Sequence, residues 1–292
     1  PMKSSRNVLY GSLLLLPAVV LLWTFTYQPI IGTIIDSLFS TPRGKRPAAF
    51  VGLDQYQRMF DDPVFWKAMV NNLIYALTTI PLSMALALLM ALLVNSRLKG
   101  QAVVRMAYFT PTILPMVAVA NIWLFFYAPD YGLVDRFLQI FGWGGNNLLG
   151  MPETALGALI AITIWKEAGF FMIFYLAALQ QISPALLEAA NLEGASYGQT
   201  LRRIILPLLM PTTLFVSINA VIGAFRLVDH IIVMTKGAPD NATTLLLFYI
   251  YQVGFGYWDT GYAAALTVIL LFILALIALF QFGYADKKVH YR

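Results

Sequence analysis

The chain has 292 residues, of which 60% are hydrophobic and only 11% are charged, and its mean hydropathy is +0.74. Soluble domains carry roughly 25% charged residues, so this composition excludes an ordinary soluble protein and predicts an integral membrane protein. The lack of cysteine excludes a disulfide framework and a thiolate metal site. The two histidines, His230 and His290, lack metal-ligand spacing, so we expect no metal site.

Six apolar runs are long enough to cross a bilayer, which takes about 20 helical residues. They cover residues 8–29, 69–94, 106–128, 155–179, 207–227 and 263–283. The first run is too long for a signal peptide and lacks a small-residue cleavage site, so we expect an uncleaved span. Pro17, Pro81, Pro111 and Pro115 fall inside spans, where neighbouring helices satisfy the freed backbone groups. The sequence predicts one all-α integral membrane domain, residues 1–292, with six transmembrane helices.

The positions of lysine and arginine predict the orientation. One set of short segments holds ten basic residues and three acidic ones, whereas the opposite loops hold eight basic and ten acidic residues. The ten are Lys3, Arg6, Arg97, Lys99, Arg105, Arg202, Arg203, Lys287, Lys288 and Arg292. Both termini are therefore predicted to be cytoplasmic. The net charge of +5 is explained by this bias, and we expect no nucleic-acid partner.

An outer segment, residues 50–72, precedes the second span. Phe50, Leu53, Tyr56, Met59 and Phe60 recur in it at roughly helical spacing. This pattern predicts an amphipathic helix lying on the outer interface of the membrane.

A polar stretch, "EAANLEGASYGQTLRRIILPLLMP" (188–211), separates the fourth and fifth spans within a loop at 180–207. We expect a helix from Pro184 that ends at Gly194, since glycine suits a left-handed C-terminal cap. Ser196 is expected to cap a second helix that continues to Leu206, with Pro207 at the entry to the fifth span.

The apolar residues of this loop have two possible neighbours. Ala189, Ala190 and Leu192 have no apolar surroundings in a loop, so their burial against another protein is one interpretation. The other is a short amphipathic turn on the inner headgroups, with Arg202 and Arg203 near lipid phosphates. The residues alone leave both open.

The loop resembles the signature cytoplasmic loop of the membrane subunits of binding-protein-dependent ATP-binding-cassette importers. That pattern runs Glu-Ala-Ala, three residues, Gly, nine residues, then Ile-x-Leu-Pro. Glu193 stands where the family more often has Asp, and Leu201 where it often has Phe. The matching residues are Glu188, Ala189, Ala190, Gly194, Ile204, Leu206 and Pro207.

Within that family the chain is similar to the maltose-type carbohydrate and glycerol-3-phosphate uptake permeases. The stretches that carry the similarity are "FVGLDQY", "IWK", "LAALQQIS" and "FRLVDHIIVMTKGAP". In the last stretch Asp229, Thr235, Gly237 and Pro239 match the family pattern, whereas Ala238 replaces a glycine.

The resemblance implies a type I importer permease fold in a bacterial inner membrane, as a multi-pass subunit without catalytic activity. The implied partners are a second homologous permease, two ATPase subunits and an extracytoplasmic solute-binding protein. ATP and Mg²⁺ are expected on the ATPases, since the chain lacks a Gly-rich phosphate loop ending in Gly-Lys-Ser/Thr. The loop helix is then the coupling helix, seated on an ATPase through Glu188, Ala189, Ala190 and Leu192, with Gly194 permitting the turn.

The fourth span carries charge near its centre, where unpaired charge is costly. Thr163, Lys166, Glu167 and Phe170 fall on one helical face, and hydroxyl, charged and aromatic groups together suit a sugar. The resemblance to maltose-type permeases implies that this stretch lines the mid-membrane sugar site. The alternative is that Lys166 and Glu167 pair with the partner permease or cap water cavities.

The fifth span adds Asn219 and Gly223 to this candidate substrate path. By the same resemblance, Ala220, Ala224 and Leu227 would line it. Arg226 has two interpretations: it serves an anionic substrate such as a glycerol phosphate, or it pairs with Asp229 three residues on, which we favour.

The function predicted is half of the translocation path for a sugar, oligosaccharide or glycerol phosphate in an ATP-driven importer. A secondary transporter or channel independent of ATP is the alternative. No inverted repeat between the two halves supports it, and it leaves the polar loop without a purpose. An intramembrane enzyme is disfavoured, because the chain has no Gly-x-Ser-x-Gly or His-Glu-x-x-His motif.

Overall fold

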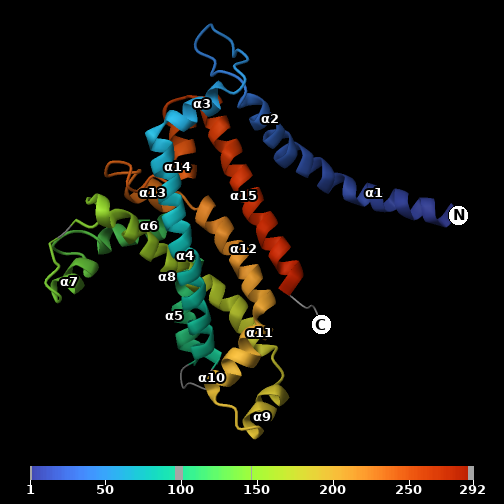
Figure 1. Cartoon of the computed structure of the whole chain (residues 1–292), viewed down its shortest axis with the longest axis vertical. Helices are drawn as coiled ribbons and strands as arrows, with labels where there is room; N and C mark the ends of the chain where they lie inside the picture. Colours follow the sequence, from blue (N-terminus) through green and yellow to red (C-terminus); the bar gives the residue numbers. More distant parts are fainter. Residues whose placement is uncertain (1, 96–100, 146, 289–292) are drawn as a thin grey trace. The chain divides into compact units, whose positions relative to one another are not determined.

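The computed structural model describes residues 2–95, 101–145 and 147–288, and most of them are helical (Figure 1). Arg97, Lys99 and Arg292, which entered the orientation argument, lie outside the described residues. The chain divides into two compact units. The first comprises Pro1–Asp62 and Ile250–Phe272, and the second comprises Pro63–Tyr249 and Ile273–Arg292.

The predicted all-α membrane fold is confirmed. Among the described residues, five helical segments are long and apolar enough to cross a membrane, and one bent pair of helices brings the number to six. The five are Tyr10–Asp36, Pro63–Asn95, Pro152–Gln180, Met210–Met234 and Thr260–Gln281, and the bent pair is Ala102–Ile113 with Met116–Phe126. Each overlaps one of the six predicted runs.

The expectation of a continuous third span is wrong. Residues 106–128 do not form one helix: α5 (Gln101–Ile113) ends before Leu114, and α6 (Met116–Phe126) leaves it at 104°. The break falls at Pro115, whose φ of −57° and ψ of 145° are not helical. A proline has no backbone N–H and crowds the residue before it, so it ends a helix when its surroundings allow the chain to turn.

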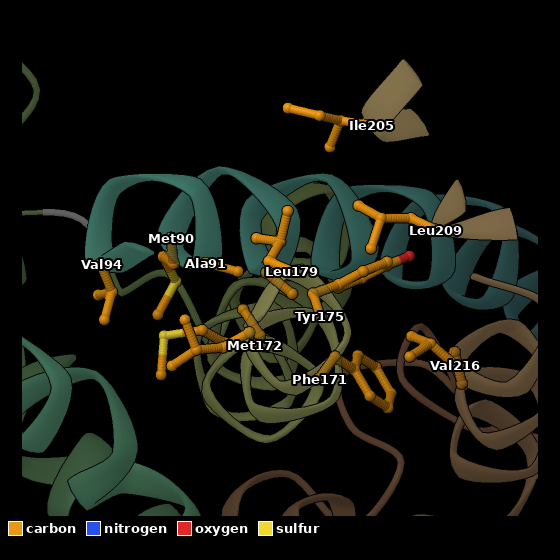
Figure 2. Packing of buried hydrophobic residues seen from close by; sticks show 14 residues of the cluster. Met90, Ala91, Val94, Phe171, Met172, Tyr175, Leu179, Ile205, Leu209 and Val216 are labelled. Atoms are coloured by element: carbon orange, nitrogen blue, oxygen red, sulfur yellow. The ribbon is translucent and has the colours of Figure 1, made fainter. Parts of the chain in front are cut away.

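The second unit is built around α4 (Pro63–Asn95) and α8 (Pro152–Gln180), which pack together along most of their length. Small buried residues on α4, among them Ala76, Ala87 and Ala91, let the backbones approach closely, as in many membrane bundles. Figure 2 shows residues of α4, such as Met90 and Val94, facing those of α8. This cluster also takes in the end of the loop and the start of the fifth span, through Ile205, Leu209 and Val216.

The other elements of the second unit surround this pair. They are α7 (Leu133–Gln139), α9 (Pro184–Leu192), α10 (Tyr197–Thr200), the π-helical turn η2 (Leu201–Ile205), α11 (Leu206–Leu208), α12 (Met210–Arg226), α13 (Asp229–Met234) and α14 (Leu246–Tyr251). Two asparagines of α4 hold the segment between α13 and α14. The Asn71 amide donates to the Asn241 and Thr244 carbonyls at 2.9 and 3.0 Å, and the Leu246 N–H donates to the Asn72 amide oxygen at 3.0 Å.

The first unit contains α1 (Met2–Leu22), the π-helical turn η1 (Trp23–Tyr27), α2 (Gln28–Asp36) and α3 (Asp54–Asp61). It also contains the π-helical turn η3 (Gln252–Gly256) and the start of α15 (Thr260–Lys288). None of the described side chains in Tyr10–Asp36 is buried within the chain. The apolar side chains of this span are therefore not covered by the rest of the first unit.

The helix expected over residues 50–72 is shorter than predicted. Only α3 is helical before the second span, because the chain is extended at Asp62, directly before Pro63, where proline disfavours a helical residue. Phe50, Leu53 and Phe60 are exposed as an interfacial segment requires, whereas Met59 is buried in the unit.

Asp259 joins the outer segments of the first unit. Its carboxylate accepts hydrogen bonds from Arg58 Nη1 at 2.7 Å and from Thr41 Oγ1 at 2.5 Å. The Arg58 guanidinium also lies over the Tyr262 ring, 4.1 Å from its centroid. Burial acts to raise the pKa of Asp259, but the hydrogen bonds from Thr41 and Arg58 and the charge of Arg58 outweigh it and hold the pKa below the ordinary 3.8.

We predict that Asp259→Asn lowers the free energy of unfolding by about 1.5–3 kcal/mol, the usual range for hydrogen bonds to a charged group. The apparent melting temperature in detergent should fall by several degrees. Asp240→Asn is the matched control, because Asp240 forms only an exposed ion pair with Lys67.

The same comparison has a pH dependence with a defined sign. A carboxyl group whose folded-state pKa is lowered stabilises the fold fully above its ordinary pKa of 3.8 and loses that contribution as the pH falls below it. The difference in melting temperature between wild type and Asp259→Asn should therefore narrow below pH 3.8. A difference that grows as the pH falls contradicts the assignment.

Candidate functional site

The loop between the fourth and fifth spans forms a rigid helical corner. α9 begins with Pro184 at its first position and ends at Leu192. Gly194 then has a φ of +76°, a left-handed conformation that suits glycine. Its N–H donates to the Asn191 carbonyl at 3.1 Å, and the Ala195 N–H donates to the Ala190 carbonyl at 3.0 Å, so the end of α9 is capped.

A capping box starts the second helix of the corner. The Gln199 N–H donates to Ser196 Oγ at 3.4 Å, and the Ser196 N–H donates to Gln199 Oε1 at 2.8 Å. After α10 the chain passes through η2 and α11 into α12 without leaving helical geometry. The helix predicted from Ser196 to Leu206 is thus present, with a π-helical turn inside it.

The structure divides the predicted coupling residues by exposure. Glu188 and Ala189 are exposed, and Leu192 is 90% exposed. Ala190 points the other way and is only 5% exposed, since it packs within its own chain. In Figure 1, α9 and α10 lie at the end of the second unit, beyond the last turns of α4 and α8.

The inner side of the corner is hollow. A space of about 450 Å³ opens between α9 and the α10–η2 segment, lined by Ala190, Glu193, Thr200 and Arg203 among others. Thr200 is buried, and its hydroxyl has no hydrogen-bond partner among the described residues. The corner therefore has exposed residues and a recess lined by both polar and apolar residues, Ala189 among them.

Lys166 is directed away from any open path. It is only 9% exposed, and its Nζ donates to the Pro111 carbonyl at 3.1 Å and to the Leu114 carbonyl at 2.7 Å. Both carbonyls lie at the break between α5 and α6. Its neighbour Glu167 extends from a different side of α8, because successive residues of a helix are about 100° apart.

Glu167 lines a small hollow between α4, α8 and α12. Six of the ten predicted path residues line it. Four further residues line it as well, three from α4 and one from α8. The predicted ones are Thr163, Glu167, Ala220, Gly223, Ala224 and Leu227, and the additional ones are Thr79, Ile80, Ser83 and Phe171. The hollow has a volume of about 10 Å³, which is room for about one water molecule.

The remaining predicted path residues lie elsewhere. The Phe170 ring packs against Phe174 at 5.1 Å between centroids, and the Asn219 amide donates to the Phe215 carbonyl of its own helix. Arg226 is exposed at the end of α12. Its favoured ion pair with Asp229 is not formed among the described residues, because the chain becomes extended at Leu227 and the two lie on different helices.

The sequence analysis missed the contribution of α4. Tyr75, Thr79 and Ser83 recur every fourth residue within an apolar span, a spacing that places polar groups on one helical face. The Tyr75 hydroxyl lies 2.6 Å from Thr163 Oγ1 and 3.1 Å from His230 Nε2, and all three residues are buried. This chain of hydrogen bonds joins α4, α8 and α13 beside the hollow.

Comparison with known proteins gives the family. Residues 67–291 match the family described as binding-protein-dependent transport system inner membrane component. The trehalose/maltose transport system permease protein MalF of Thermococcus litoralis is 35% identical, over 93% of this chain and 91% of its own length. The sulfoquinovosyl glycerol transport system permease protein SmoG of Agrobacterium fabrum is 34% identical, over 90% and 85%. The sn-glycerol-3-phosphate permease UgpA of the same organism is 30% identical, over 98% and 97%.

Solved structures agree with these relatives. The crystal structure of a bacterial ABC transporter involved in the import of the acidic polysaccharide alginate contains a chain with a TM-score of 0.86 at 27% identity, over 99% of both chains. A second structure, of the alginate transporter in complex with an alginate pentasaccharide-bound periplasmic protein, has a TM-score of 0.85 at 26% identity, over 98% and 96%. The prediction made from the loop motif is confirmed: the chain belongs to the family of inner-membrane components of binding-protein-dependent transport systems, the permease subunits of ABC importers.

Proposed function

We propose that this chain forms half of the translocation path of an ATP-driven importer for a neutral carbohydrate and couples to a cytoplasmic ATPase through the 188–207 loop. The observation that carries the proposal is α9, a capped helix with Glu188, Ala189 and Leu192 exposed, set between two spans of a permease of this family. The relative named for trehalose/maltose supports a neutral carbohydrate as the cargo.

The energy and the delivery of substrate come from partner proteins in this proposal. The chain has no phosphate-binding loop, so ATP and Mg²⁺ are assigned to two ATPase subunits. A solute-binding protein outside the membrane delivers the cargo, which the alginate transporter bound to its periplasmic protein supports. The excess of lysine and arginine in one set of loops supports a cytoplasmic location for both termini and for α9.

The corner has a mechanical connection to the rest of the second unit. Leu187 of α9 and Leu201 of η2 pack against the cluster that joins α4, α8 and α12. Densely packed side chains transmit displacement because they leave little room to give way. A push on α9 by closing ATPases is therefore passed to the three helices that surround the hollow.

The hollow itself fits a closed half of a path. Ligand sites usually occupy roughly 300–1,000 Å³, far more than the 10 Å³ present between α4, α8 and α12. The proposal assigns the opposite wall to a second, homologous permease, and the path opens as the helices move apart. The apolar span Tyr10–Asp36 supports such an assembly, since its side chains are not buried within the first unit.

The chemistry of the hollow favours a neutral cargo. Its polar groups are the hydroxyls of Thr79, Ser83 and Thr163 and the Glu167 carboxylate, which suit sugar hydroxyls. Among the residues that the structure describes, no lysine or arginine lines it, because Lys166 is bonded to backbone carbonyls and Arg226 lies outside. An anionic cargo such as a glycerol phosphate meets a carboxylate here without a compensating cation.

We predict that Glu188→Ala separates the permease from its ATPase. Pull-down from native membranes in mild detergent, read by mass spectrometry, should recover a homologous permease and an ATPase with wild type. The variant should lose at least roughly tenfold of the ATPase, because removing one member of a buried interfacial ion pair costs about 2–5 kcal/mol. It should keep the second permease.

Glu153→Ala is the matched control, since Glu153 is exposed in the first turn of α8, at the helix end remote from the corner. Equal recovery of the ATPase with wild type, Glu188→Ala and Glu153→Ala contradicts the proposed role of α9. Recovery of the chain alone from wild-type membranes contradicts the importer assignment itself.

A second prediction concerns the cargo. Membrane vesicles that contain the importer and its binding protein are offered maltose, trehalose and lactose as neutral probes, and sn-glycerol 3-phosphate and alginate oligosaccharides as anionic ones. We expect accumulation of a neutral probe, reduced roughly tenfold or more by Glu167→Gln, as for the loss of one charge-assisted hydrogen bond. Glu153→Gln should leave uptake unchanged. Preferential uptake of an anionic probe contradicts the neutral-cargo proposal.

A further inference from the structure

The break in the third span removes hydrogen bonds from two carbonyls, that of Pro111 in the last turn of α5 and that of Leu114 directly after it. In a continuous helix the N–H of residue 115 donates to the carbonyl of residue 111, four positions earlier. Residue 115 is a proline and has no N–H, so the Pro111 carbonyl lacks its helical donor. The turn of 104° also takes the Leu114 carbonyl out of line with α6, whose first bond runs from the Val119 N–H to the Pro115 carbonyl.

Such carbonyls need another donor. The hydrocarbon of a bilayer supplies no water, so a broken transmembrane helix persists only where protein groups satisfy the freed backbone. The two carbonyls also form the C-terminal end of α5, where the helix dipole is negative and a cation is favoured. The break therefore requires a donor, and a positively charged one is preferred.

Lys166 meets both requirements. Its ammonium group reaches the Pro111 carbonyl at 3.1 Å and the Leu114 carbonyl at 2.7 Å, the two groups that the break deprives of donors. One turn further along α8, Gly169 allows the close approach that this reach needs. A Cβ at position 169 would lie 2.3 Å from the Tyr108 carbonyl oxygen and 3.0 Å from Thr112 Oγ1.

We propose that Lys166 is a positioning residue that replaces the hydrogen bonds lost at Pro115 and so holds the angle between α5 and α6. Through that angle it acts on α6, whose Met116 and Val119 pack with Ala158 and Ile162 of α8. Lys166 is not among the described residues that line the hollow. This role is independent of the proposed function, since it rests only on geometry within the second unit.

The test is a double-mutant cycle between the two partners, made in the complex as it purifies from native membranes. The variants are Lys166→Met, which keeps the length of the side chain and removes its donors, Pro115→Ala, which restores a backbone N–H, and the double variant. Lys166→Arg tests rescue by another cation. Lys67→Met is the matched control, since Lys67 pairs with Asp240 at an exposed site away from the break.

Two readouts follow the cycle. One is the apparent melting temperature. The other is the distance distribution between spin labels at Val103 on α5 and Phe125 on α6, both exposed, measured by double electron–electron resonance. We expect Lys166→Met to lower the melting temperature and to broaden or shift the distances, whereas Lys166→Arg and Lys67→Met remain close to wild type. In the Pro115→Ala background the effect of Lys166→Met on melting should fall to less than half.

The proposal is overturned if Lys166→Met has the same effect with and without Pro115, or if the label distances do not change. If Lys166→Met alone cannot be recovered from membranes, recovery of the double variant supports the proposal and its failure overturns it. None of these readouts depends on transport, so the neutral-cargo and coupling proposals stand or fall separately.

Discussion

Backbone hydrogen bonding inside a bilayer is the constraint on which this structure depends. Every carbonyl in a span needs a donor from the protein, and the third span breaks that rule at Pro115 unless another helix supplies one. Lys166 does so from α8, at the cost of burying a charge that the two carbonyls and the dipole of α5 help to compensate. The turn that results allows α6 to pack against α8 and α13 instead of continuing along α5.

α8 is accordingly the helix against which the other parts of the second unit are positioned. One side packs on small residues of α4, another holds the broken span through Lys166 and Gly169, and a third presents Thr163 and Glu167 to the hollow. The same helix ends at Gln180, three residues before Ser183, the N-cap position of α9. The parts assigned to bending and to cargo thus lie on one helix, and the coupling corner follows it in the chain and packs on the same cluster, which gives movement of the corner a direct physical route to the hollow.

Much of this arrangement was predictable from the sequence, because it follows from local chemistry. The lengths of the apolar runs predicted six spans, and proline, glycine and serine at 184, 194 and 196 predicted the corner and its caps. The break in the third span was not predictable from the sequence, since a proline within an apolar run is found both at mild kinks and at full breaks. Which one forms depends on a donor, Lys166, that is 51 residues away in the sequence.

The candidate path illustrates the same limit. Residues on one helical face were identified correctly as neighbours of one another, yet Lys166 is hydrogen-bonded to the broken span and Phe170 packs against Phe174 of its own helix. Asn219 likewise bonds to the backbone of its own helix. The predicted pairing of Arg226 with Asp229 assumed that the helix continues through both residues. In the structure α12 ends at Arg226, and Leu227 is extended. The spacing of Tyr75, Thr79 and Ser83 indicates a polar face on α4. That this face lies beside the hollow became evident only from the helices packed against it.

Uptake by proteoliposomes tests the central claim, that this permease works by coupling to an ATPase, most directly. The complex purified from native membranes is reconstituted with its binding protein, and accumulation of a neutral sugar is followed with ATP and Mg²⁺ enclosed, or with a proton gradient and no nucleotide. The account predicts accumulation against a gradient only with ATP and Mg²⁺, together with ATP hydrolysis. Accumulation driven by the proton gradient alone contradicts it and identifies a secondary transporter.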